Sequence, residues 1–231
     1  MSTVKFIIEI LVIVAAVILA SYAAERLLSK KSGQAFTVIT TKKIAMTGVF
    51  AAVSGVLMLL DIPVPFAPSF YKIDISEVPV LILSFAYGPI AGILCEMIKI
   101  FVKLILKGTT SAFVGELANF VIGASFIIPA GIIYFARKTK KQAIIACIAG
   151  TLVMTAFGSF FNAVYLLPKF AEIYGMPLEK IVAMGTAINP AISSVAGLVL
   201  MCVVPVNIIK GVLDSVITVL LYKRLSPVLK K

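Results

Sequence analysis

The chain contains no histidine and only three cysteines among its 231 residues. Histidine is the commonest catalytic base and metal ligand near neutral pH, so its absence removes the usual basis of a catalytic or metal site. Cys95, Cys147 and Cys202 all fall in apolar stretches, at spacings that match neither a zinc site nor a redox pair. The His-Glu-x-x-His and Gly-x-Ser-x-Gly motifs are also missing. We therefore predict a protein that is not an enzyme, with no metal site and no cofactor.

Charged residues are scarce as well. They make up 13% of the chain, whereas 61% of the residues are hydrophobic and the mean hydropathy is +1.13. Soluble domains average about 25% charged and about 45–50% apolar residues, so this composition excludes a single water-soluble core. The apolar residues do not alternate with a period of two, as they do in outer-membrane barrels. Since helices are the other structure that satisfies the backbone in lipid, we predict an all-α polytopic membrane protein.

Long stretches without any charged residue define the expected helices, because about 20 apolar residues span a bilayer. Proline and glycine should interrupt them: a proline-rich segment follows Leu60, Gly88-Pro89 should end a short helix that begins near Val78, and Pro190 and Pro205 should divide the last apolar region. We expect a six-helix core plus one extra N-terminal transmembrane helix. The uncharged stretches are Ile10–Ala24, Ile44–Leu60, Val78–Cys95, Leu117–Ala136, Gln142–Pro168 and Ile181–Ile209.

Basic residues outnumber acidic ones by 21 to 10, and they cluster between the expected helices. The clusters lack interleaved aromatic residues, which disfavours nucleic acid as the partner. Under the positive-inside rule they place residues 26–43, 137–141 and 223–231 in the cytoplasm. The proline-rich segment 61–74 and a polar segment over 169–179 should then lie outside. These features predict a multi-pass protein of the plasma membrane with a cytoplasmic C-terminus and an outward-facing pocket.

The first apolar stretch, Val4–Ala24, has two interpretations. Small residues near its end resemble a signal-peptide cleavage site, but the stronger positive charge follows the stretch instead of preceding it, which favours a retained helix. The domain organisation that follows is an extra helix over 1–30, a cytoplasmic linker over 31–42 and a six-helix domain over 43–231.

Charged side chains within one expected span, where each costs about 2.5–3.5 kcal/mol to insert, require a structural or functional reason. Glu96 and Lys99 are three residues apart on one helix and can form an ion pair. Lys103 and Lys107 should extend toward the outer interface. Lys99 lies deeper, where a structural ion pair and a ligand contact are both open.

Asparagines form a second polar set. Asn207, Lys210 and Asp214 share one face of the last span, where Lys210 can pair with Asp214 and where we favour ligand binding. Asn119 and Asn162 also fall in the outer halves of their spans, and Tyr165 follows Asn162 by three residues. An amide offers both a donor and an acceptor, which suits a flat heterocycle, although asparagine also joins helices within membranes.

Small residues on the second span could allow another helix to approach closely. Gly48 with Ala52, and Ala51 with Gly55, form two overlapping small-xxx-small pairs. Either a partner surface or internal packing would account for them, and we carry the four residues forward as a candidate partner interface.

The chain from about Phe36 to its C-terminus resembles the riboflavin-specific S components of energy-coupling-factor (ECF) transporters. The order and spacing of several short segments carry the resemblance. They are 71–79 (YKIDISEVP), 87–89 (YGP), 107–109 (KGT), 115–120 (GELANF), Asn162 with Pro168, 205–210 (PVNIIK) and 222–227 (YKRLSP). The family usually has Phe at the position of Val206, and the helix over Val4–Ala24 lies outside its common six-helix core.

The resemblance implies a subunit that binds riboflavin from outside and docks on a transmembrane T component carrying two cytoplasmic ATPase subunits. Hydrolysis of ATP in those subunits would power release of the vitamin inside. The chain lacks the Gly-x-x-x-x-Gly-Lys-Ser/Thr phosphate cradle and so is not expected to be the motor. The expected ligand contacts are Asn119, Asn162, Tyr165, Asn207 and Lys210, with Phe66 and Tyr71 covering the mouth of the pocket.

Two other functions fit a membrane protein of this size. One is an S component for a different vitamin or small heterocyclic metabolite, which the ligand of the purified protein would distinguish. The other is an autonomous ion-coupled carrier, for which inverted repeats with matched broken helices would be the sign. The sequence shows no such repeat.

Overall fold

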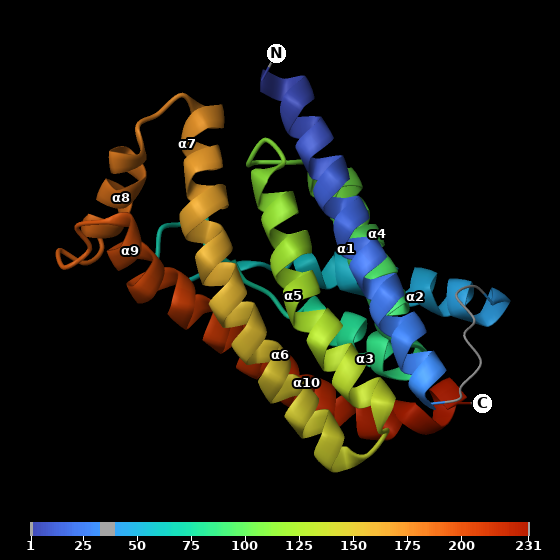
Figure 1. The fold of residues 1–231 in the computed structure, drawn as a ribbon. Helices are drawn as coiled ribbons and strands as arrows, with labels where there is room; N and C mark the ends of the chain where they lie inside the picture. The colour runs from blue at the N-terminus through green and yellow to red at the C-terminus, as the bar shows by residue number, and fades with distance from the viewer. Residues whose placement is uncertain (1, 33–39, 231) are drawn as a thin grey trace.

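The computed structural model describes residues 2–32 and 40–230, and most of them are helical (Figure 1). Within these residues, five helical runs are long and apolar enough to cross a membrane: 4–30, 41–58, 114–136, 140–174 and 195–222. Two further helices complete the bundle, the short α3 (Glu77–Tyr87) and α4 (Pro89–Lys107). The prediction of six core helices plus one N-terminal helix is confirmed.

Helix α1 (Ser2–Ser32) lies along α4 and α5, as Figure 1 shows. It extends past the predicted boundary at residue 30, and residues 33–39 of the predicted linker lie outside the described part of the chain. Helix α2 (Thr41–Met58) begins after Thr40, whose side-chain oxygen accepts a hydrogen bond of 3.1 Å from the amide of Lys43.

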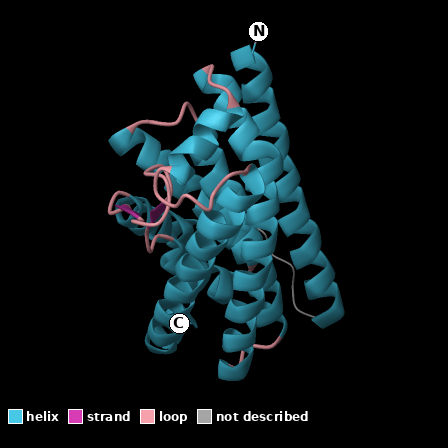
Figure 2. Cartoon of the chain, turned by 90° about the vertical axis from the view of Figure 1, so that its left-hand side faces the viewer, coloured by secondary structure: helices cyan, strands magenta, loops and turns pink. Residues whose placement is uncertain are grey.

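A hairpin loop, residues 59–76, connects α2 to α3. Strands β1 (Ile62–Pro63) and β2 (Lys72–Ile73) pair antiparallel within it, and they are the only strands among the described residues. Pro65 and Pro68 lie between the strands, where their fixed backbone angles disfavour a helix. The predicted interruption after Leu60 is confirmed, and Figure 2 shows the short strands and loops at one side of a helical bundle.

Gly88 separates α3 from α4, as predicted. Its φ of +100° lies in the region that favours glycine, and a Cβ at this position would come within 2.5 Å of the Glu25 carboxylate on α1. Pro89 then opens α4, where its missing N–H has no helical partner to lose. The break therefore also lets α1 approach the start of α4.

Helix α5 (Val114–Ala136) packs against α6 (Lys140–Phe161). The α6 run does not end near Pro168: it widens into a π-helical segment, η1 (Asn162–Leu166), and continues as α7 (Leu167–Tyr174). The first half of the predicted polar segment over 169–179 is therefore helical. Gly175, with φ of +59°, ends α7.

The last apolar region behaves in the same way. Helix α8 (Leu178–Thr186) and α9 (Val195–Leu198) flank the loop that contains Pro190, as predicted. However, α9 continues through a second π-helical segment, η2 (Val199–Val203), into α10 (Val204–Lys230), so Pro205 does not divide the helix.

Both π-helical segments end two residues before a proline, Pro168 or Pro205. A proline inside an α-helix removes one hydrogen bond and presses its ring against the carbonyl group four residues earlier. The wider π turn relieves that contact, and the helix continues instead of breaking.

Apolar side chains lie both in the interior of the bundle and on its outer surface. Helix α2 packs against α4, and α10 packs against α6 and α3. Phe85, Tyr134 and Tyr222 form an aromatic cluster with ring centroids 4.3–5.5 Å apart. By contrast, Leu19, Ile105 and Leu200 are each at least 65% exposed, as expected of side chains that face lipid.

Candidate functional site

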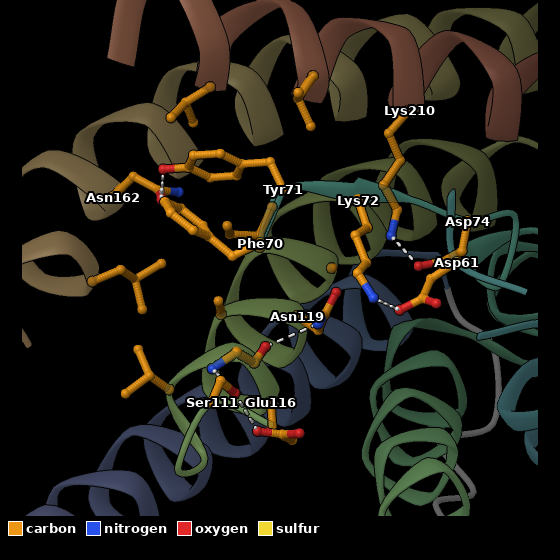
Figure 3. Close-up of a pocket in the computed structure, with 18 of the residues that line it drawn as sticks. Asp61, Phe70, Tyr71, Lys72, Asp74, Ser111, Glu116, Asn119, Asn162 and Lys210 are labelled. Carbon is orange, nitrogen blue, oxygen red and sulfur yellow. Dashed lines mark hydrogen bonds and ion pairs between the residues drawn. The ribbon is translucent and has the colours of Figure 1, made fainter. Parts of the chain in front are cut away.

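A cavity of about 240 Å³ lies between the hairpin loop and the ends of α5, η1, α7 and α10 (Figure 3). Its walls combine apolar side chains with a small number of amide and charged groups, as small-molecule sites do. Besides the residues discussed below, its lining includes Met58, Val114, Ala118, Ile122, Met154, Leu166, Leu167, Val203 and Val206.

The three predicted asparagines meet at this cavity, although they come from three different helices. Asn119 on α5 donates from Nδ2 to the carbonyl of Gly115 at 2.9 Å, and Asn162 donates to the carbonyl of Gly158 at 2.9 Å. These bonds to the preceding helical turn fix the orientation of both amides.

Asn207 on α10 is different. Its side chain is 5% exposed, lines the cavity, and has no hydrogen-bond partner for Nδ2 among the described residues. A buried donor without a partner costs about 1–3 kcal/mol, so native structures seldom retain one without a reason. A ligand that accepts this hydrogen bond would provide the reason.

Two aromatic side chains of the hairpin loop enter the cavity. Tyr71 donates its hydroxyl hydrogen to Oδ1 of Asn162 at 3.2 Å (Figure 3). Phe70 lies beside Tyr71, with ring centroids 4.6 Å apart, and stacks on Phe170 of α7 at 5.4 Å. Burial raises the pKa of Tyr71, which therefore stays a neutral hydroxyl at neutral pH.

Phe66, predicted to cover the mouth of the cavity, is not among the residues that line it. It packs against an apolar cluster that includes Leu167 and Val203, and its carbonyl accepts a hydrogen bond from Sγ of Cys202 at 3.4 Å. Phe70, four residues later, does line the cavity, and it lies in a turn closed by a hydrogen bond of 2.8 Å from the amide of Tyr71 to the carbonyl of Pro68.

Lys210 lines the cavity, but its predicted pairing with Asp214 is wrong. Its ammonium group lies 3.4 Å from Oδ2 of Asp74, near the end of the hairpin loop, and 3.6 Å from Oε1 of Glu77, the first residue of α3. The carboxylate oxygens of Asp214 are buried without a hydrogen-bond partner among the described residues. Lys210 thus joins α10 to the end of the hairpin loop.

Asp74 is held in its charged form. Burial raises its pKa, but the ammonium groups of Lys210 and Lys99 and hydrogen bonds from the hydroxyl and amide of Ser76 outweigh burial and hold the pKa below its usual value. The ion pair with Lys210 therefore persists at neutral pH.

Beneath the cavity, Lys99 lies 2.7 Å from Glu96, which confirms the predicted pair. It also lies 2.8 Å from Glu77, a contact that helical spacing within α4 does not indicate. All three side chains are at most 1% exposed. Glu77 therefore links Lys99 to Lys210, and this structural network accounts for the charges deep in α4.

Lys103 and Lys107 do not simply extend toward an interface. Lys103 pairs with Glu116, whose carboxylate also accepts hydrogen bonds from Thr109 and Ser111. Lys107 lies 2.8 Å from Asp61, which also pairs with Lys72 at 3.0 Å. These ion pairs form part of the polar rim of the cavity.

Tyr165 was predicted to contact the ligand, but it lies outside the cavity lining. Its hydroxyl donates to Oε2 of Glu9 on α1 at 2.8 Å. The predicted partner surface is also narrower than expected. Gly48 and Ala52 are exposed on α2, whereas Ala51 and Gly55 are buried, and a Cβ on Gly55 would overlap Val102 of α4. Ala51 and Gly55 therefore serve packing within the chain.

Noncovalent recognition is the chemistry that this arrangement supports. Three amides, the ammonium group of Lys210 and the rings of Phe70, Tyr71 and Phe170 line a partly apolar slot, so a flat ligand could stack and exchange hydrogen bonds along its edge. Within the described residues, no group of three or more Cys, Asp or Glu side chains could hold a metal ion.

Comparison with known proteins agrees with this picture. Residues 42–222 match the family model described as "ECF transporter, substrate-specific component". The riboflavin transporter FmnP of Bacillus subtilis is 34% identical over 187 residues, which cover 80% of this chain and 93% of that protein. The riboflavin transporter RibU of Staphylococcus aureus is 33% identical over 190 residues, or 82% and 93% of the two chains.

A solved structure, that of the S component of a bacterial ECF transporter, is similar as well. It superposes with a TM-score of 0.64 at 34% identity, and the match covers 82% of this chain and 98% of that one. The six-helix core therefore has a counterpart, whereas α1 lies wholly before the residues that the family model matches.

Proposed function

The chain belongs to the family of ECF transporter substrate-specific components, and from this premise we propose that it binds riboflavin and delivers it across the membrane. It is a transport protein and not an enzyme. The naming of similar proteins as riboflavin transporters supports the choice of ligand.

The observation that carries the proposal is the unsatisfied Nδ2 of Asn207, which lies in the cavity with Asn162 and Lys210. The isoalloxazine ring of riboflavin is flat, largely apolar on its faces, and bordered on one edge by carbonyl oxygens and ring nitrogens. Asn207 and Lys210 can donate to such an edge, while an amide such as Asn162 can donate and accept. Phe70 and Tyr71 offer aromatic faces for the ring.

The basic clusters support an orientation in which the cavity opens to the outside. Arg137 and Lys140, at the opposite end of α5 from Asn119, belong to a segment rich in lysine and arginine, and such segments are retained in the cytoplasm. The same rule supports a cytoplasmic C-terminus, so riboflavin would enter the cavity from the extracellular side, past the hairpin loop.

Transport requires partners that supply energy, since the chain has no phosphate-binding cradle for ATP. We propose docking on a transmembrane T component that carries two ATPase subunits. The exposed Gly48 and Ala52 of α2 support this, because two small residues four apart allow a second helix to approach closely.

An absorption spectrum of the detergent-purified full chain, followed by titration with riboflavin, tests the ligand. We expect a yellow protein, or a ligand-free protein that quenches flavin fluorescence stoichiometrically. A chain that is folded but neither carries nor binds riboflavin would instead indicate an S component for another small heterocyclic metabolite.

A further inference from the structure

Helix α1 lies outside the residues that the family model matches, yet polar side chains in both halves of α1 contact the six-helix core. In its second half, Glu25 pairs with Lys43 at 3.2 Å and accepts a hydrogen bond from the amide of Ile90 at 2.9 Å. In its first half, Glu9 lies 3.0 Å from Lys169 and accepts the hydroxyl hydrogen of Tyr165 at 2.8 Å. The helix is therefore attached through specific polar contacts as well as apolar packing.

Glu9 contacts the same helical segment that forms one wall of the cavity, but on the face that points away from the cavity. Tyr165 lies in η1 and Lys169 lies in α7, and neither faces the cavity. Asn162 of the same η1 and Phe170 of the same α7 do line the cavity. A single helical segment thus presents one face to the ligand site and another face to α1.

The segment formed by η1 and α7 depends on contacts from another helix to hold its position. A π-helical segment marks a local departure from regular α-helical hydrogen bonding, and such segments often occur at functional sites. Lys169 is 10% exposed, and its ammonium group also lies over the ring of Phe6 on α1, 5.2 Å from the centroid. Without α1, the Tyr165 hydroxyl would lose its partner and Lys169 would keep only Glu172, within a helical run that is long and apolar enough to cross a membrane, where unpaired polar groups are costly.

We propose that α1 is a positioning helix for the binding site, and that Glu9 sets the lifetime of bound riboflavin by holding Tyr165 and Lys169. Glu9 does not touch the ligand. It restrains the segment that carries Asn162 and Phe170, so loosening it lets these side chains move away and the ligand leave. The inference rests on the proposed function, because riboflavin is the ligand whose release is measured.

The chain offers a matched control for this contact. Lys169 pairs with a second carboxylate, Glu172, at 3.1 Å, but Glu172 belongs to α7 itself and is 57% exposed. Glu172→Gln therefore removes one of the two negative charges that pair with Lys169 and leaves the contact between Lys169 and Glu9 of α1 in place. Tyr165→Phe removes only the hydroxyl and leaves the Glu9–Lys169 ion pair in place.

The experiment measures riboflavin dissociation from the full chain in lipid nanodiscs, by stopped-flow fluorescence after mixing with a non-fluorescent competitor. We expect Glu9→Gln to accelerate dissociation about 3- to 30-fold, in line with typical couplings between packed sites, while association changes little. Tyr165→Phe should accelerate it less, Glu172→Gln should not, and the effects of Glu9→Gln and Tyr165→Phe should not add in the double variant.

Several outcomes would overturn the inference. One is a wild-type dissociation rate in Glu9→Gln, and another is equal acceleration by Glu172→Gln, which would assign the effect to the charge of Lys169 alone. If Glu9→Gln fails to fold, an unchanged rate in Tyr165→Phe overturns it. A wild-type chain that binds no riboflavin refutes the proposed function instead, so the two failures can be told apart.

Discussion

Replacing Asn207 with leucine should have opposite effects on the ligand-free protein and on the complex. In the ligand-free structure, Nδ2 of Asn207 is buried and has no partner among the described residues. Leucine has a similar shape and no donor, so the substitution removes an unsatisfied group and should leave the melting temperature unchanged or higher. The complex, by contrast, loses a hydrogen bond to the ligand.

The size of the loss follows from the same burial. An unpaired polar group in a buried site costs about 1–3 kcal/mol, which corresponds to a roughly 5- to 150-fold weaker affinity. Titration of the purified variant with riboflavin gives the affinity, and thermal unfolding without riboflavin gives the stability. Ser159→Ala is the control, because the Ser159 hydroxyl is also buried and unpartnered among the described residues but lies outside the cavity lining.

Two results would refute this reasoning. Wild-type affinity in Asn207→Leu would show that the amide does not meet the ligand. A parallel loss of affinity and of ligand-free stability would show that the amide has a structural role and that binding falls only because the fold is damaged.

Three further predictions concern the hairpin loop and α2. Tyr71→Phe should raise riboflavin affinity about 2- to 10-fold, because it frees Oδ1 of Asn162 from a competing hydroxyl and keeps the ring; a weaker titration would show instead that the hydroxyl contacts the ligand. Ala52→Leu should reduce uptake in cells while riboflavin binding to the isolated chain survives, whereas Ala156→Leu on the exposed face of α6 should change neither; equal uptake in the two variants would argue against α2 as the docking surface. For Asp61, burial raises the pKa, but Lys107 and Lys72 outweigh it and hold the pKa below the ordinary 3.8. Its stabilising contribution is therefore present above that value and is lost as the pH falls through the lower folded-state pKa. Asp61→Asn should lower the ligand-free melting temperature at pH 7, and the difference from wild type should shrink in acid below 3.8; a constant difference across this range would contradict the assignment.

The helices were predictable because hydropathy and helix interruption are local properties of the sequence. Uncharged runs located the spans, and Gly88-Pro89 located the break between α3 and α4. Asn119, Asn162 and Asn207 were predictable as a group because all three lie at similar depth in their helices. Lys99 with Glu96 followed from helical spacing alone.

Several errors at the site share one physical cause, which is that the position of a residue along its helix does not say what packs against each face. Asn162 and Tyr165 were predicted together because both lie toward the outer end of one apolar stretch, but within the π-helical segment Asn162 lines the cavity whereas Tyr165 bonds to Glu9 on α1. The pairs on α2 look alike in sequence, yet Ala51 and Gly55 face α4 whereas Gly48 and Ala52 do not. Lys210 reached Asp74, 136 residues away, instead of its helical neighbour Asp214.

The two π-helical segments also bear on how binding sites of this shape can diverge. Each accommodates roughly one residue more than a regular α-helix would need over the same rise. Deleting a single residue from Val199–Val203 would therefore restore an α-helix and leave Asn207 and Lys210 on the face of α10 that lines the cavity. The same deletion within a regular stretch of the helix would instead rotate everything beyond it by about 100°, since a turn contains 3.6 residues. Wide turns of this kind are thus a route by which descendants of one ancestral chain can gain or lose a residue and still present the same side chains to the ligand.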